Sequence, residues 1–236
     1  MKYLDMFIED CKYYDIENIE LKSILKSVNV KEKTILDLGT GIGRLAFPLL
    51  KHAKKVVALD NDKRLEKYFR KNKKKNLTFV NQNAKKYIKG KKFDIILLAW
   101  PIFNFNFIEH VKNAMHKKSR FIFLTCDNNS DFETIVDKLG VVKKERFKKD
   151  VLNKNKFLEQ LSKRFRVLIK KKLKTRYIYP NKKTAFRVIK NGIRMWFKIN
   201  LNKKAEEKLI KLINKHKKKG KIIFDEEIYL YILKLK

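Results

Sequence analysis

The stretch "TILDLGTGIGRLA", residues 34–46, places a short apolar run directly before three glycines at alternate positions. The whole chain of 236 residues holds only seven glycines, and three of them fall within residues 39–43. An apolar run followed by glycines predicts a buried strand that turns tightly into a helix. Glycine tolerates the positive φ angles of such a turn and leaves the backbone amides open to a ligand. The stretch therefore predicts a binding site at the end of a strand.

Short apolar or β-branched runs recur along the chain and alternate with segments of helical character. The runs lie at residues 34–38, 55–60, 77–80, 93–100 and 120–125, and the helical segments at 44–53, 62–73 and 106–117. Strands that alternate with helices are joined by right-handed crossovers, which produce a parallel sheet with both faces covered. The pattern predicts a Rossmann-like α/β fold.

The two ends of the chain complete this expectation. Residues 3–28 have apolar positions near helical spacing and predict one or two helices. A further helix is expected in "DFETIVDKLG", with Gly140 at its C-terminus. Residues 164–179 and the C-terminal "KIIFDEEIYLYILKLK" are long strand-like runs that we expect to pair antiparallel. The sheet should thus have seven strands, mostly parallel, with an antiparallel last strand.

Two amphipathic helices are expected between these long strands, as a helical insertion before the last strand. Their apolar stripes are predicted to be Phe186, Ile189, Ile193 and Trp196 in the first helix, and Ala205, Leu209, Leu212 and Ile213 in the second. We expect a single domain, with a helical cap at 1–30, a Rossmann-like core at 31–180, the insertion at 181–219 and the final strand at 220–236.

The chain carries a formal net charge of +35, from 60 Lys and Arg against 25 Asp and Glu. Residues 140–236 hold 32 basic and 8 acidic residues, so most of the excess lies in the second half. Such a field attracts phosphate backbones and favours RNA or another acidic molecule as a partner. Only ten of the sixty basic residues are arginine, the residue favoured for bidentate phosphate contacts. A broad compositional preference for lysine, with a solvated lysine face, explains the charge equally well.

Other classes of protein are disfavoured by the remaining composition. Cys11 and Cys126 lie far apart and show neither disulfide-framework nor metal-ligand spacing, and no metal site is expected. The longest apolar run, residues 95–103, is shorter than the roughly 20 residues that cross a bilayer, and the N-terminus mixes acids into its apolar residues. We therefore expect a cytoplasmic protein without a membrane contact.

Two carboxylates frame the glycine turn. Asp60 ends the predicted second strand, where a carboxylate can accept both hydroxyls of a ribose. Asp37 stands two residues before the glycines and would repel a diphosphate, but it suits a ligand with cationic groups. The glycine spacing also departs from the Gly-x-Gly-x-x-Gly pattern of dinucleotide sites. Both features favour a positively charged adenosine derivative.

The run "DLGTGIG", with Asp37, Gly39, Gly41 and Gly43, resembles the first motif of the class I S-adenosylmethionine-dependent methyltransferases. The resemblance implies that S-adenosylmethionine is the cofactor and that these residues contact it. Asp60 and Asn61 match the ribose-binding positions of that family. Residues 31–126 carry the match.

Later motifs extend the resemblance. "FVNQNA", residues 79–84, resembles the third-strand motif, which implies that Asn83 and Ala84 face the adenine, although the family more often has Asp where Asn83 stands. "FDIILLAW" resembles the fourth strand, whose end lies beside the transferable methyl group, and Trp100 there could stack on the cofactor or on an acceptor ring. The alternative for Trp100 is plain packing.

"AWPIFNF", residues 99–105, is the expected acceptor side of the site. Methyltransferases that act on the exocyclic amine of a base commonly carry Asn or Asp before Pro-Pro-aromatic at this place, and Ala99-Trp100-Pro101 lacks that polar residue. No catalytic dyad is evident, and methyl transfer needs a base only when the acceptor is protonated. Of the histidines at 52, 110, 116 and 216, His110 is the best candidate for such a base.

Three functions remain open from the sequence. The second half is similar to family members acting on small molecules, in which N-terminal helices and an insertion before the last strand cover the substrate. A small-molecule acceptor is therefore the first expectation. An RNA methyltransferase that uses the lysine-rich C-terminal half is the alternative, and a non-catalytic protein that binds S-adenosylmethionine is the third.

Overall fold

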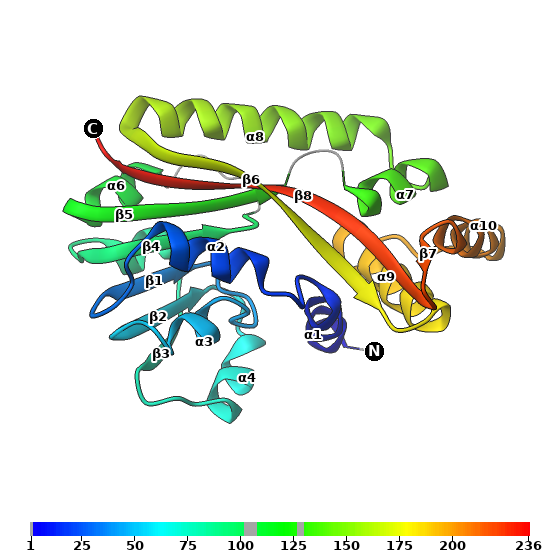
Figure 1. Ribbon diagram of the computed structural model, residues 1–236, viewed down its shortest axis with the longest axis horizontal. Coiled ribbons are helices and arrows are strands. Elements are labelled where there is room, and N and C mark those ends of the chain that lie inside the picture. The colour runs from blue at the N-terminus through cyan, green and yellow to red at the C-terminus, as the bar shows by residue number, and fades with distance from the viewer. Residues whose placement is uncertain (1, 102–107, 127–129) are drawn as a thin grey trace. The chain divides into compact units, whose positions relative to one another are not determined.

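The computed structural model describes residues 2–101, 108–126 and 130–236 (Figure 1). The chain divides into two compact units, which we call the helical unit and the sheet unit. The helical unit comprises Met1–Ile19, Cys126–Lys149 and Leu173–Ile228, and the sheet unit comprises Glu20–Thr125, Asp150–Lys172 and Tyr229–Lys236. The sequence predicts a single domain, and this division into two units does not test that prediction.

Five strands of the sheet unit form a parallel ladder. They are β1 (Thr34–Leu38), β2 (Lys55–Asp60), β3 (Leu77–Asn81), β4 (Phe93–Ala99) and β5 (Met115–Cys126). β1 pairs in parallel with both β2 and β4, β2 pairs with β3, and β4 pairs with β5. The carboxyl ends of β1, β2 and β4 therefore meet at one edge of the sheet, where a Rossmann-like fold binds its ligand.

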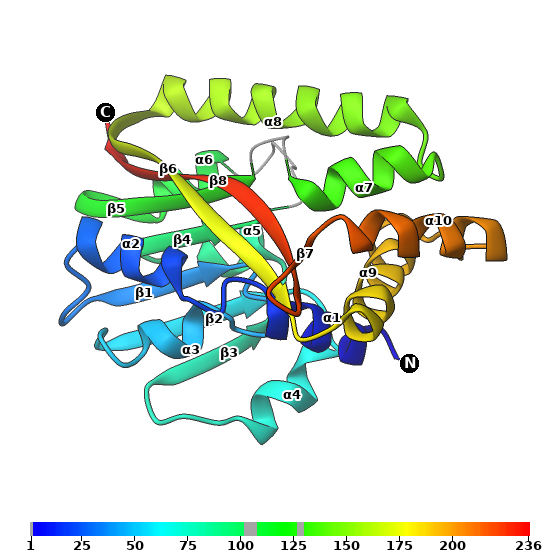
Figure 2. The same cartoon turned by 45° about the vertical axis from the view of Figure 1, so that its right-hand side comes forward.

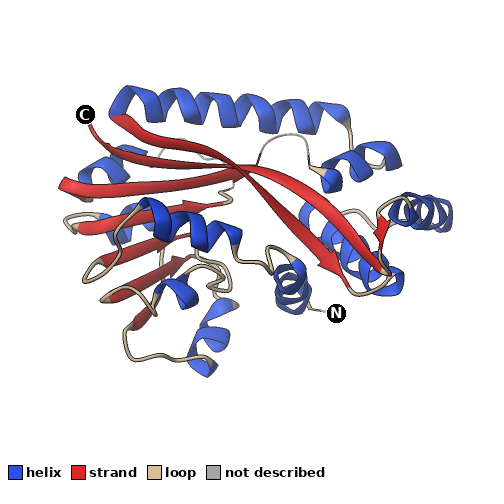
Figure 3. Cartoon of the chain, in the orientation of Figure 1, coloured by secondary structure: helices blue, strands red, loops and turns tan. Residues whose placement is uncertain are grey.

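Two long strands belong to both units. β6 (Phe165–Tyr179) begins in the sheet unit and ends in the helical unit, and β8 (Lys221–Leu235) runs the opposite way. The strand order is β3-β2-β1-β4-β5-β8-β6, and the two-residue β7 (Lys217–Lys218) pairs antiparallel with β8. The predicted mostly parallel sheet with an antiparallel last strand is confirmed, and Figure 3 shows its strands in red.

Helices cover both faces of the sheet unit. The core on one face joins alternate strand residues such as Leu36, Ile96 and Phe123 to Ile88 of α5 and Phe157 of α8. On the other face, α3 contacts β2 and α4 contacts β3. The helices of this unit are α2 (Ile19–Ser27), α3 (Ala46–Leu49), α4 (Leu65–Lys71), α5 (Ala84–Ile88), α6 (Ile108–Asn113) and the greater part of α8 (Lys144–Arg164).

The helical unit has its own core. Four helices, α1 (Tyr3–Tyr13), α7 (Asp131–Leu139), α9 (Lys182–Phe197) and α10 (Lys203–Asn214), belong to it together with one end each of β6 and β8. The packing of this core comes from α7, α9, α10 and β8. Each of them supplies a buried residue, namely Ile135, Ile189, Leu209 and Phe224, respectively. Figure 2 shows α7, α9 and α10 from the side.

The expected helix ends are seen where their capping chemistry is strong. Gly140 has φ +71° and caps α7, as its sequence position predicts. Ser130 and Asn181 accept hydrogen bonds from backbone amides at the N-termini of α7 and α9, respectively. Side-chain caps of this kind fix where the helices begin.

Three expectations need correction. Trp196 is 37% exposed, and Met195 and Val188 take the buried positions instead, so the stripe of α9 is rotated from the predicted one. Residues 115–117, expected to be helical, form the start of β5. The helix expected at 44–53 is helical only over Ala46–Leu49, because turns occupy the residues on either side.

No helix in the part of the chain described here is long and apolar enough to cross a membrane. Within the same residues, no group of three or more His, Cys, Asp or Glu side chains is arranged to hold a metal ion.

Candidate cofactor-binding site

The glycine turn lies where β1 ends, within the sheet unit. The amides of Gly39 and Thr40 donate to the carbonyl of Leu59 in β2, at 2.8 and 3.1 Å. Gly39 has φ +67°, and a Cβ atom built there meets no atom within 4 Å. The backbone at Gly39 therefore faces open space, which is the geometry that allows a ligand to approach closely.

Gly43 serves packing instead. Its φ is +76°, and a Cβ atom there would lie 2.8 Å from the ring of Phe47 and 3.1 Å from that of Phe69. The last glycine of the motif thus lets the chain pass tightly over an aromatic cluster beneath the turn.

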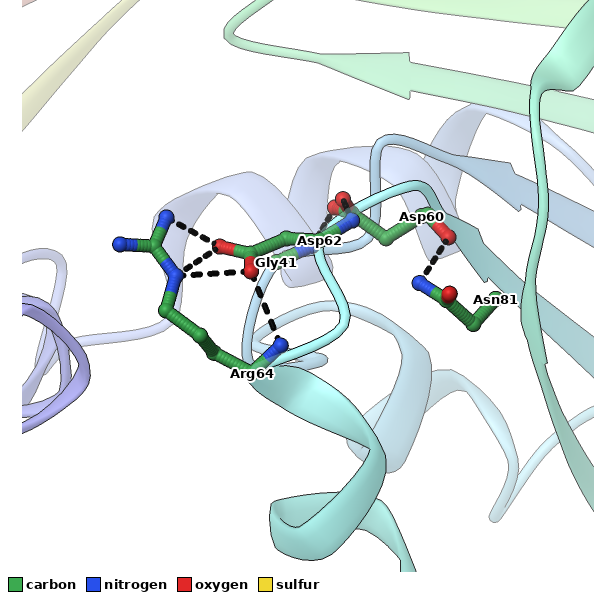
Figure 4. A network of polar contacts seen from close by, with 5 residues as sticks. All are labelled: Gly41, Asp60, Asp62, Arg64 and Asn81. Carbon is green, nitrogen blue, oxygen red and sulfur yellow. Dashed lines mark hydrogen bonds and ion pairs between the residues drawn. The ribbon is translucent and has the colours of Figure 1, made fainter.

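Asp60, at the end of β2, is bonded to the glycine turn. Its Oδ2 accepts from the amide of Gly41 at 3.0 Å, and its Oδ1 accepts from the amide of Asp62 at 3.0 Å (Figure 4). The Asn81 side chain donates to the Asp60 carbonyl at 3.2 Å. A carboxylate has about four acceptor positions, so two amides orient Asp60 and leave capacity for hydroxyl donors.

Asp37 is buried in β1 and is 3% exposed. Burial raises its pKa to about 7, against the smaller lowering effects of the 2.7 Å hydrogen bond from the Thr40 hydroxyl and of the Arg44 charge, while Asp60 adds a further increase. The repulsion from Asp60 means that the two carboxylates act on the same region. A cationic ligand beside Asp37 would relieve the cost of holding this charge out of water.

Trp100 follows the last residue of β4 and is held by a buried carboxylate. Its indole Nε1 donates to Oε1 of Glu20 at 2.9 Å, and Arg44 Nη2 bonds to Oε2 of the same residue at 2.5 Å. Glu20 is fully buried in α2. One carboxylate therefore joins α2, the residue after the glycine turn and the end of β4.

The backbone of Trp100 is unusual. Its φ of +55° lies in the left-handed region, which an aromatic residue rarely adopts, and its amide donates to Leu124 of β5 at 3.0 Å. The side chain is 36% exposed. Strain of this kind persists where surrounding contacts fix a residue, and the bonds from Glu20 and β5 supply them here.

The other predicted cofactor residues lie nearby with smaller roles. Asn61 is exposed directly after Asp60. Gln82 donates its amide to the Asp60 carbonyl, which brings the segment before Asn83 against Asp60. The Asn83 oxygen caps α5 by accepting from Lys85 N at 3.0 Å, and Ala84 packs on the sheet core. A contact of Asn83 or Ala84 with adenine stays a prediction.

Part of the expected acceptor segment, residues 102–105, lies outside the described residues. His110 is half-buried in α6. Tyr14, near the N-terminus, is buried in the helical unit, where its hydroxyl lies 3.0 Å from Thr175 Oγ1 and its ring packs on Tyr177. These contacts favour a packing role for Tyr14.

Sequence reasoning missed Thr40, Glu20 and Arg44. Thr40 and Arg44 lie inside or beside the quoted glycine stretch, so their position was a usable signal. Glu20 gave none, because an acid in the first turn of a helix is ordinary at the surface. Only the fold reveals that it is buried and bridges two cationic or donor groups.

The chain was compared with known proteins. Residues 13–125 match the family model described as ribosomal RNA adenine dimethylase. Over 93 residues the chain is 33% identical to a protein of Methanosphaera stadtmanae named probable ribosomal RNA small subunit methyltransferase A. This similarity covers 37% of the chain and 34% of that protein, so the chain matches about a third of the relative's length.

Solved structures share the fold at low identity. A candidate methyltransferase of Bacillus halodurans has a TM-score of 0.56 at 16% identity, over 91% of this chain and 98% of that one. A candidate RNA methyltransferase of Pyrococcus horikoshii has a TM-score of 0.50 at 14% identity, over 91% and 81% of the two chains. These likenesses support the Rossmann-like fold.

The two outer glycines of the turn should respond differently to alanine. Gly43→Ala forces a methyl group into the Phe47 ring at a positive φ, and we expect it to lower the free energy of unfolding by about 2 kcal/mol or more. Gly39→Ala meets open space, so only about 1 kcal/mol of backbone strain is expected. Urea denaturation measures both. Equal losses in the two variants would contradict the distinction.

Asp37→Asn should stabilise the protein at high pH. The pKa of Asp37 is about 7 when folded and about 3.8 when unfolded, so the folded state binds more protons between these values and wild-type stability falls as pH rises through them. The variant lacks this penalty and should be more stable above pH 7, by up to about 4 kcal/mol. Urea denaturation at pH 4, 6 and 8 tests this, with Asp62→Asn as the control, because Asp62 is half-buried and its pairing with Arg64 lowers its pKa, which predicts the opposite trend with pH. A gain that does not grow with pH would rule out the buried charge.

Proposed function

Because this chain belongs to the class I S-adenosylmethionine-dependent methyltransferases, we propose that it transfers a methyl group to a nucleotide of RNA. S-adenosylmethionine is the cofactor of that class, and the niche around Asp37, Gly39 and Asp60 is the part of this chain that would hold it. RNA was the alternative acceptor from the sequence, and the comparisons favour it over a small molecule.

The observation that carries the proposal is the match of residues 13–125 to the ribosomal RNA adenine dimethylase model. These residues include the glycine turn, Asp60 and Trp100, so the match falls on the candidate site itself. The relative named a ribosomal RNA methyltransferase supports the same substrate class. The net charge of +35 suits a polyanionic partner. A cytoplasmic location, where ribosomal RNA is found, belongs to the same proposal.

The residues fit the cofactor by charge and shape. Asp37 offers a buried negative charge for a cationic group, Asp60 is oriented for hydroxyl donors, and Gly39 leaves the backbone open. When bound, S-adenosylmethionine supplies an electrophilic methyl group and leaves as a neutral thioether. The chain's own task is alignment and exclusion of water, which can lower such a barrier by roughly 7–11 kcal/mol. Trp100, fixed by Glu20, is placed at the end of β4 to shield that region.

The acceptor atom is a separate part of the proposal. Ala99 stands where enzymes acting on an exocyclic base amine commonly carry a polar residue, and its methyl side chain offers no hydrogen bond for such an amine. We therefore infer an acceptor other than that amine, despite the adenine dimethylase name of the matching family model. Analysis of the labelled nucleoside by mass spectrometry tests this inference, and a methylated exocyclic amine would contradict it.

Cofactor binding should depend on Asp60. We expect Asp60→Ala to weaken S-adenosylhomocysteine binding at least a hundredfold, because it removes both the hydroxyl acceptor and the bond that orders Gly41. Isothermal titration calorimetry measures the affinity. Asp62→Ala is the matched control, since Asp62 bonds to Arg64 rather than to the turn and should bind as wild type does. Unchanged affinity in Asp60→Ala would remove Asp60 from the site.

Tritiated methyl transfer tests the substrate class. With total RNA, protein and small-metabolite fractions from the same cells, we expect label in RNA, and none with the Asp37→Asn variant, which cannot offer the buried charge. Label confined to the metabolite fraction would restore the small-molecule acceptor. Tight S-adenosylhomocysteine binding with no label in any fraction would favour the non-catalytic binding protein.

A further inference from the structure

A groove lies along β3, the edge strand of the sheet unit. Its volume is about 660 Å³, and its lining includes Arg70 of α4, the loop residues Lys73, Lys74 and Lys75, and Phe79 and Asn81 of β3. β3 stands at one end of the strand order and pairs only with β2 among the described strands. The groove is therefore a surface feature distinct from the glycine turn.

The groove is strongly cationic. Arg70, Lys73, Lys74 and Lys75 are all exposed, and Glu66 is the single acid of its lining. None of these four cations takes part in a salt bridge with another described residue, whereas lysines and arginines elsewhere in the chain do. Unneutralised charge held along one groove favours an anionic occupant with several charges in a row.

An aromatic column ends in the same groove. The rings of Phe69 and Phe79 are stacked with centroids 4.3 Å apart at 10°, and Phe47 stacks on Phe69 at 5.4 Å and 14°. Phe79 is half-buried and lines the groove. A planar ring entering the groove can extend this stack, and a nucleobase offers such a ring.

We propose that this groove binds a single-stranded segment of RNA, with its phosphates on Lys73, Lys74, Lys75 and Arg70 and a base against Phe79. The proposal rests on the proposed function, and it names the surface that holds the RNA beside the site of methyl transfer.

Single-stranded RNA fits better than the competing partners. The faces of bases are available for stacking on a side chain when the bases are unpaired, whereas a duplex presents its phosphates, sugars and base edges but keeps the base faces stacked inside. An added peptide strand could pair with the β3 edge, but it gives no reason for four cations and an aromatic ring to share one groove. Five residues of strand span roughly 15 Å, enough for a few nucleotides.

The groove also adjoins the candidate cofactor site. Asn81 lines the groove and donates its side-chain amide to the carbonyl of Asp60, as Figure 4 shows. An RNA strand lying along β3 would therefore reach the end of the strand that contacts the ribose-binding acid. This places a bound substrate strand and the cofactor niche at adjoining positions of one unit.

The test is direct binding of fluorescent 12-nucleotide oligouridylate and oligoadenylate to the full chain, measured by anisotropy between 50 and 300 mM salt. The variant replaces Lys73, Lys74 and Lys75 by Gln. The matched control replaces Lys217, Lys218 and Lys219 by Gln, because these are also three consecutive exposed lysines and lower the net charge equally. Far-ultraviolet circular dichroism and urea midpoints verify that both variants are folded.

We expect the groove variant to bind at least tenfold more weakly at 50 mM salt than the control variant. Its plot of log affinity against log salt should be shallower by about 2, since each phosphate contact on a single strand contributes about 0.7 to the slope. Phe79→Leu should weaken binding without changing the slope, because it removes stacking and keeps the charges.

Several results would overturn the proposal. Equal affinities and slopes for the two triple variants would show that the lysines act only through net charge. Tighter, groove-dependent binding of a hairpin duplex, or Phe79→Leu binding as wild type does, would exclude the single-stranded assignment. Methyl transfer to RNA is measured on the same preparations, so labelled RNA with no groove effect overturns this proposal alone. Groove-dependent binding without RNA labelling overturns the proposed function alone.

Discussion

The hydrogen bond from the Gly41 amide to the Asp60 carboxylate joins the ends of β1 and β2, and the candidate site depends on it. Parallel strands bring these ends to one edge, but they do not by themselves fix the path of a glycine-rich turn. The Leu59 carbonyl holds the start of the turn and Asp60 holds its middle. Asp60 orders the turn, and in the function that we propose it also receives a ligand, so the two roles compete for its lone pairs. Four acceptor positions on one carboxylate allow both.

The chain as a whole is positively charged, but the candidate cofactor niche carries negative charge. The chain as a whole carries +35, which favours a polyanion, while the niche at the end of β1 concentrates two carboxylates. A cationic cofactor would be repelled by the protein's overall field, and the buried Asp37 offsets this locally, where the low dielectric makes its charge effective over short range. The Arg44 charge acts on Asp37 and works against that effect, and the ion pair of Arg44 with Glu20 offsets part of it. The acid niche and the basic surface are therefore compatible.

Much of the fold was predictable from residues that follow strict local rules. Three features lie where the sequence predicts them: the strand at 34–38, the acid that ends the second strand at 60, and the left-handed Gly140 at a helix C-terminus. The helix α8 was not predicted, because its mean hydropathy is low and apolar residues such as Phe157 and Leu161 are sparse among lysines. Its burial depends on a sheet face that no local pattern describes. Trp196 was misplaced for the same reason, since bulk and hydrophobicity do not tell which side of α9 its unit covers.

The roles of the residues at the glycine turn could also be predicted only in part, because tertiary contacts decide them. In the sequence, Gly43 cannot be told apart from Gly39 and Gly41. In the structure, its lack of a side chain leaves room for Phe47, which stacks on Phe69, and Phe69 stacks in turn on Phe79. One aromatic column therefore lies beneath the glycine turn and ends at the groove along β3. Stacked rings in a packed interior resist compression, so a displacement at the turn is opposed by the column rather than absorbed. The candidate cofactor niche and the proposed RNA groove thereby share one packed aromatic support, which runs from Phe47 under the turn to Phe79 in the groove.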